Sequence, residues 1–147
     1  MNNYLLVAHE FSPFVGSECE QGWNLCIQIA KSRPDINFYV VHASASSVGV
    51  HNYNDNILLY LENNELPKNL TLIPVGYPQK YNFLYSLNNS LCKFFGPIGF
   101  PFFFFLFYFI WQKNAFKTVT SYNIKFSCVH IINLINAVMP GPLLKLG

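Results

Sequence analysis

The sequence predicts an α/β protein, with a Rossmann-like parallel sheet flanked by helices that takes in all 147 residues as one domain. Three short apolar runs, at 4–8, 38–41 and Leu70–Val75, are typical of strands buried on both faces. Segments with helical spacing lie between these runs. Strands that alternate with helices favour a parallel sheet with right-handed crossovers.

The composition restricts the classes of function. A net charge of +2 without a basic stripe argues against nucleic acid as a partner. Only 11% of the residues are charged and 52% are hydrophobic, so we expect a membrane or another domain to cover part of the surface. The cysteines lack C-x-x-C spacing, which favours reduced core thiols and a cytoplasmic protein, either free or peripheral on the inner face of the membrane. They are Cys19, Cys26, Cys92 and Cys128.

The turn after the first run is the most specific stretch of the chain. Ser12-Pro13 breaks the strand, and Gly16 can adopt the positive φ of a tight turn. Ser17 and Glu20 have the spacing of a capping box, which predicts a helix that begins at Ser17.

Two further residues shape the predicted helix, which Pro34 should end and in which Gly22 should allow close packing on the strand. A turn of this kind places backbone N–H groups and the positive end of a helix at the carboxyl end of a strand, where anions bind. An ordinary strand-to-helix turn is the alternative.

The remaining elements follow from periodicity and breakers. A helix is predicted at 54–63, the strand Leu70–Val75 follows Pro67, and apolar residues from Tyr81 to Leu91 have helical spacing. A last strand is predicted at 126–132, before a loop that contains Pro140 and Gly141.

Residues 94–111 include no charged residue, and they include a run of four phenylalanines. Glycines and prolines crowd the first half of this segment, so only 102–111 is expected as an unbroken helix, which is short for a membrane span. The surplus of phenylalanine is compatible with peripheral contact with a membrane, and equally with a plain buried helix.

The turn and the C-terminal third resemble the N-terminal domain of family 4 retaining glycosyltransferases, which have the two-domain GT-B fold. The resemblance near the N-terminus consists of a Ser-Pro, an aromatic residue, G-S-E and, after three residues, G-W-N: Ser12, Pro13, Phe14, Gly16, Ser17, Glu18, Gly22, Trp23 and Asn24. Further matches follow later in the chain: Tyr108, Trp111, Gln112, Phe116, Val129, His130, Asn133, Pro140 and Gly141. Ile131 and Val138 depart from the pattern, where the family has His and usually Arg, and the lost cation puts activity in doubt.

The resemblance implies transfer of a hexose from a nucleotide sugar to a glycan or lipid-linked acceptor, with retention. Gly16 and Ser17 would present N–H groups to the donor phosphate, and Glu18 would orient an acceptor hydroxyl. His130 would lie beside the transferred sugar, with Asn133 and Gly141 also in the cleft. Glu18 and His130 are therefore the candidate catalytic residues.

Simpler roles exist for several of these residues. Ser17 is expected to cap the helix in either case, and Glu18 could merely oppose the helix dipole. Trp23 is expected in the core. The histidines His9, His42 and His51 share no ligand spacing with one another or with a cysteine, so we expect no metal and no cofactor besides the nucleotide-sugar substrate.

The family's enzymes carry a second Rossmann-like domain with paired glutamates for the donor, which these residues do not include. We therefore expect a fragment, or a separately encoded C-terminal domain as partner, and little activity from the chain alone. The alternative is a non-enzymatic, membrane-associated remnant that keeps the fold.

Overall fold

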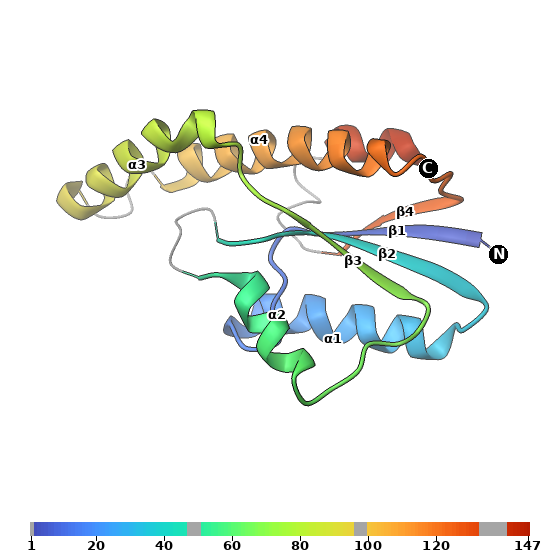
Figure 1. The fold of residues 1–147 in the computed structure, drawn as a ribbon. Coiled ribbons are helices and arrows are strands. Elements are labelled where there is room, and N and C mark those ends of the chain that lie inside the picture. The colour runs from blue at the N-terminus through green and yellow to red at the C-terminus, as the bar shows by residue number, and fades with distance from the viewer. Residues whose placement is uncertain (1, 47–50, 96–99, 133–140) are drawn as a thin grey trace.

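The computed structural model describes residues 2–46, 51–95, 100–132 and 141–147. Four parallel strands form one sheet in the order β3-β2-β1-β4 (Figure 1). They are β1 (Asn2–Ala8), β2 (Ile36–Ala43), β3 (Leu70–Val75) and β4 (Cys128–Ile131). The predicted α/β, Rossmann-like parallel sheet is confirmed.

Helices cover both faces of the sheet. On one side lie α1 (Gly16–Ser32) and α2 (Tyr53–Leu61), and on the other lie α3 (Asn82–Phe95) and α4 (Phe100–Ser121) (Figure 1). Short 3-10 helices, η1 (Gln79–Tyr81) and η3 (Pro142–Leu146), precede α3 and follow β4. Within the described residues, none of the helices combines the length and the apolar character that crossing a membrane requires.

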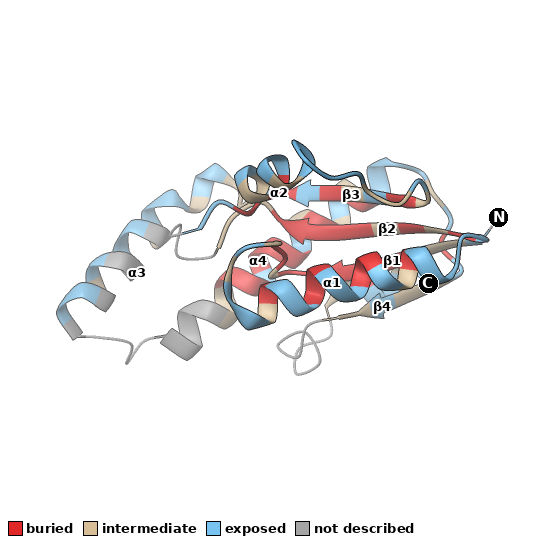
Figure 2. Cartoon of the chain, turned by 90° about the horizontal axis from the view of Figure 1, so that it is seen from below, coloured by how far each residue is buried: buried red, intermediate tan, exposed pale blue. Residues whose placement is uncertain are grey.

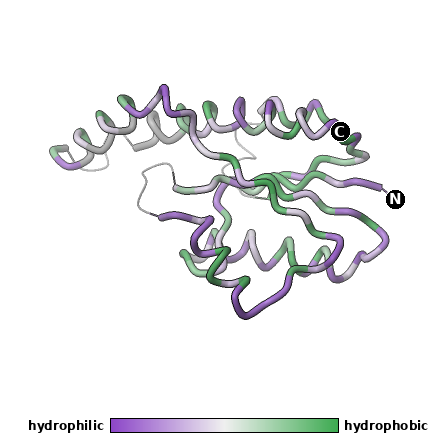
Figure 3. The backbone as a smooth tube through the Cα atoms, in the orientation of Figure 1, coloured by the Kyte–Doolittle hydropathy of each residue, from purple (hydrophilic) through white to green (hydrophobic). Residues whose placement is uncertain are grey.

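Each face of the sheet has its own hydrophobic core. Leu6, Ala8 and Val40 contribute to the core beneath α1, and Leu5 and Val7 contribute to the core beneath α4. This alternation follows from the two-residue repeat of a strand with both faces covered. Figure 2 shows the buried stripe of α1 turned toward the strands, and Figure 3 shows hydrophobic residues concentrated in the strands.

Side-chain hydrogen bonds fix the helices to the sheet. The Trp111 indole N–H donates to the Val75 carbonyl at 3.1 Å, which ties α4 to the end of β3. Asn69 donates from Nδ2 to the carbonyls of Ala30 and Ile36, which ties the end of α1 to the start of β2. Both side chains satisfy backbone groups where regular structure ends.

One local prediction is wrong. The helix α1 begins at Gly16 with Val15 as its N-cap, and the structure records no side-chain hydrogen bond from that cap. Ser17 and Glu20 therefore lie inside the helix, two positions beyond the N-cap and N3 places that a capping box requires. The extra helical residue is Gly16, whose φ of 59° is open to glycine without strain.

Candidate functional site

The strand order creates a topological switch point. The neighbours β1 and β4 run parallel, but α1 leaves β1 on one face of the sheet, whereas η3 after β4 packs on the α4 side. The next described elements after these two strands, α1 and η3, thus lie on opposite faces of the sheet. In open α/β sheets, ligands bind beyond the carboxyl ends of two such strands.

The loop between β1 and α1 is held firmly at this place. Phe11 is fully buried, with ring centroids 5.0 Å from Trp23 and 5.1 Å from His42. Ser12 Oγ accepts hydrogen bonds from the Phe14 amide and from Asn56 Nδ2. The loop is therefore anchored from beneath by side chains of α1, β2 and α2, which fixes the position of the residues that follow it.

The residues after the loop face solvent. Gly16 and Ser17 are exposed, and a Cβ built on Gly16 would meet no atom within 4 Å. The backbone at the start of α1 is thus open to a ligand. Because the first N–H groups of a helix point out of its N-terminus, they can bind an anionic group there.

Two carboxyl groups meet beside this helix end. Glu10 follows β1 and Glu18 lies in the first turn of α1, and their side chains are hydrogen-bonded to each other. Burial, reinforced by the charge of Glu18 and by this hydrogen bond, raises the pKa of Glu10 to about 7. Near neutral pH the Glu10 carboxyl group is therefore partly protonated.

A thiol and a phenol lie behind the carboxyl pair. Cys19 of α1 and Tyr53 of α2 are both buried and are hydrogen-bonded to each other. Burial, with the nearby glutamates adding to it, raises the pKa of Cys19 to about 11, so the thiol stays protonated and unreactive. Burial likewise raises the pKa of Tyr53.

The buried histidines near this edge, His9 and His42, serve the structure. His9 is buried, its Nε2 and the Tyr77 hydroxyl are hydrogen-bonded at 2.6 Å, and its ring packs against Trp111. Burial lowers the pKa of His9 to about 3 and that of His42 to about 4. Both rings are neutral, and the described residues contain no group of three or more His, Cys, Asp and Glu side chains able to hold a metal.

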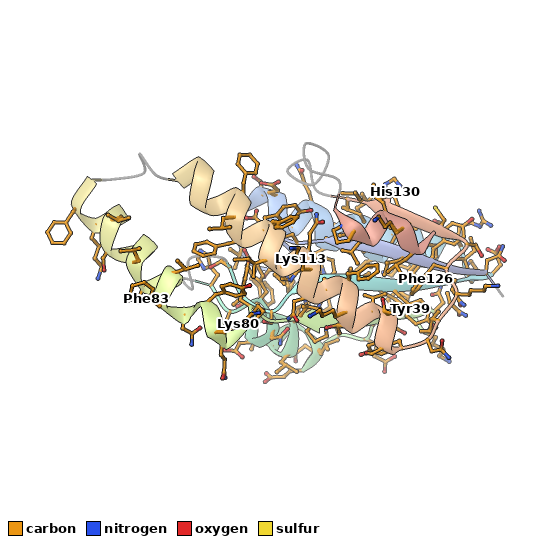
Figure 4. All side chains as sticks on the ribbon, turned by 90° about the horizontal axis from the view of Figure 1, so that it is seen from above. Tyr39, Lys80, Phe83, Lys113, Phe126 and His130 are labelled. Atoms are coloured by element: carbon orange, nitrogen blue, oxygen red, sulfur yellow. The ribbon has the colours of Figure 1, made fainter. Side chains whose placement is uncertain are left out.

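His130 lies on the edge strand β4 opposite Leu6, and its side chain is exposed (Figure 4). Its neighbours Val129 and Ile131 pack into the core beneath α4, so the His130 ring points toward the α1 side of the sheet. This is the side on which the Glu18 helix lies. Strand pairing therefore brings His130 to the same edge as the β1–α1 loop.

Gly141 has a packing role that the sequence does not suggest. A Cβ on Gly141 would lie 0.9 Å from Gln112 Oε1, so the glycine is required for close contact with α4. Gln112 in turn donates a hydrogen bond to the Tyr108 hydroxyl within the core. The remaining predicted cleft residue, Asn133, lies outside the described residues.

The sequence interpretation missed Glu10, Cys19 and Tyr53. Glu10 carried a usable signal, because it precedes the turn that Glu18 follows and a tight turn brings its two ends together. Tyr53 belongs to another helix, and the sequence offers no comparable signal for its contact with Cys19.

Comparison of the chain with protein-family models, with curated proteins and with solved structures gives no match. The comparisons therefore show no family for this chain.

Proposed function

We propose that this chain forms the acceptor-side domain of a retaining glycosyltransferase of family 4. Such an enzyme transfers a hexose from a nucleotide sugar to a hydroxyl of a glycan or a lipid-linked acceptor. The observation that carries the proposal is the Glu10–Glu18 pair, which lies beside the exposed N-terminus of α1 at the switch point of the sheet.

The carboxyl pair has the chemistry needed to bind a sugar hydroxyl. A protonated carboxyl group donates a hydrogen bond and an ionised one only accepts, whereas a hydroxyl does both. With the pKa of Glu10 at about 7, the pair offers both kinds of partner near neutral pH. It would also receive the acceptor's proton more readily than an ordinary surface carboxylate would.

The N-terminus of α1 and His130 suit the donor side of the reaction, in which the nucleoside diphosphate departs. Departure of a nucleoside diphosphate develops negative charge, which the N–H groups of Gly16 and Ser17 and the positive end of α1 would stabilise. His130, exposed on the adjacent strand, would lie beside the sugar. In the family that the sequence resembles, a second domain holds the nucleotide.

Hexose transfer tests the proposal. The chain is assayed alone and together with a donor-binding domain of this family, with nucleoside diphosphate release and labelled product as readouts. We expect turnover only with the second domain. Glu18→Gln should lower the rate about a hundredfold, whereas Glu20→Gln, an exposed change on the same helix, should leave it unaltered.

Gly16→Val gives a second test in the same assay. We expect it to abolish transfer, because a β-branched residue does not tolerate the φ of 59° at Gly16. Wild-type rates from Gly16→Val or Glu18→Gln would contradict the proposed site. Binding of neither donor nor acceptor under any condition would favour a non-enzymatic remnant with the same fold.

A further inference from the structure

The charges of the chain are segregated along the sequence. All seven acidic residues precede residue 66. Lysine supplies every charged residue after it: Lys68, Lys80, Lys93, Lys113, Lys117, Lys125 and Lys145. Because α3 and α4 belong to this second part, the helical layer on one face of the sheet is purely cationic, whereas the α1–α2 layer is rich in carboxylates.

The helix α3 also exposes a line of large apolar side chains. Phe83 is 75% exposed, Leu87 is 40% exposed and Phe94 is 85% exposed. Spacings of four and seven residues place the three on one face of the helix. Leu84 and Leu91, which belong to the adjoining face, are only partly exposed. The exposed line is therefore the outer edge of the apolar face.

Lysines flank this line at both ends and continue on α4. Lys80 lies just before α3, with its ammonium 4.9 Å from the centre of the Tyr81 ring, and Lys93 precedes Phe94. On α4, the Lys113 ammonium lies 4.4 Å from the centre of the exposed Phe109 ring. Figure 4, which looks down on this layer, shows Lys80 and Phe83 at one end of α3 and Lys113 on α4.

We propose that the outer face of α3, defined by Phe83, Leu87 and Phe94 and flanked by Lys80 and Lys93, docks the protein on the surface of an anionic lipid bilayer. Aromatic and leucine side chains at the headgroup boundary, with lysines reaching lipid phosphates, are the features of a helix that lies in a membrane interface. The charge segregation selects an anionic surface, since no carboxylate on this layer opposes it.

The position of α3 gives the docking a direction. In each view of the ribbon, α3 projects past the carboxyl ends of the strands, the edge that carries the candidate site (Figures 1 and 2). Docking would bring that edge close to the bilayer. A lipid-linked acceptor could reach it there; this consequence rests on the proposed function, whereas the docking itself does not.

Vesicle flotation tests the docking. The full chain is mixed with vesicles of phosphatidylcholine alone or of phosphatidylcholine with phosphatidylglycerol, at low and high salt. We expect binding to the anionic vesicles that weakens in high salt. Combined Phe83→Ser, Leu87→Ser and Phe94→Ser substitutions should reduce the partition coefficient about tenfold or more.

Matched controls come from the acidic side of the molecule and from the amino edge of the sheet. Leu25, Leu58 and Leu59 are also exposed, and their combined change to Ser should leave vesicle binding intact. Lys80→Gln and Lys93→Gln should each weaken binding about fivefold. Lys68→Gln, before β3, removes the same charge and should have little effect.

Several results would overturn the docking proposal. Equal binding to neutral and anionic vesicles would remove the role of the lysines, and unchanged binding by the triple α3 variant would remove the role of the helix face. Absence of vesicle binding would contradict it as well. If the triple variant instead abolished a concentration-dependent dimer, the partner of this face would be a second copy of the chain. A cooperative thermal unfolding transition in each variant, as in the wild type, shows that the fold is intact.

Discussion

The two helical layers use apolar residues for different purposes. In the α1–α2 layer, the apolar stripe of α1 is buried against the sheet, with Trp23, Cys26 and Ala30 almost fully covered. In the α3–α4 layer, Trp111 of α4 is equally buried, yet Phe94 of α3 is 85% exposed. Helical periodicity identifies an apolar face in both layers. What covers that face depends on tertiary structure. For the exposed face of α3, we propose that a lipid surface covers it.

Within the α3–α4 layer, substitutions of a buried and of an exposed aromatic residue should differ most in their effect on stability. Trp111→Ala should lower the free energy of unfolding by about 4 kcal/mol, because it leaves a cavity and removes the indole hydrogen bond to the Val75 carbonyl. Phe94→Ser, in the same layer, should change it by no more than about 0.5 kcal/mol. Urea denaturation measures both. Comparable losses would mean that the outer face of α3 is packed against the protein.

The carboxyl pair should make stability depend on pH. The pKa of Glu10 is about 7 in the folded chain and near 4.5 when unfolded, so the folded state holds the proton more tightly. The free energy of unfolding should therefore fall as pH rises from about 4.5 to about 7 and stay low above that range.

Glu10→Gln should remove this fall, and with allowance for solvent screening it should stabilise the chain at alkaline pH by roughly 2 kcal/mol. Denaturant titrations at several pH values give the profile. The exposed Glu20→Gln is the matched control and should keep the wild-type profile. An unchanged profile in Glu10→Gln would show that the pKa of Glu10 is not raised in the folded chain.

Two glycines should respond differently to the same substitution. Gly141→Ala should cost about 2 kcal/mol, since its Cβ would overlap the buried Gln112 side chain. Gly16→Ala has open space around it and should cost only about 1 kcal/mol, from the positive φ alone. The unfolding temperatures of the two variants show which substitution costs more. Gln112→Ala should relieve the Gly141→Ala clash in the double variant but not affect the cost of Gly16→Ala.

The sequence predicted the sheet well because its strands carry a local signal. The bounds of β3, Leu70–Val75, agree with the prediction, and the edge position of β3 explains how Pro74 is tolerated in it. The capping box failed because Gly16 itself enters the helix. The start of α1 therefore depended on one dihedral angle that composition does not determine.

The candidate site was predictable only in part. The turn with Gly16 and Ser17 was found at the carboxyl end of β1, and Glu18 was found beside it. The contact of Glu18 with Glu10 depends on how the turn closes, and Gly141 proves to pack against α4. The charge asymmetry that marks α3 and α4 could have been read from the sequence, since it needs only the positions of the acidic residues.

The proposed function requires sugars to bind at the carboxyl edge of β1 and β4. The most direct measurement is an NMR titration of the ¹⁵N-labelled chain with nucleotide sugars and with simple glycosides, in which the backbone amide chemical shifts are followed. We expect saturable shifts centred on Glu10, Gly16–Glu18 and His130, and smaller shifts in Glu18→Gln. Shifts confined to the hollow at the opposite end of α4, lined by Val119, Asn123 and Leu146, or no shifts with any of these compounds, would contradict it.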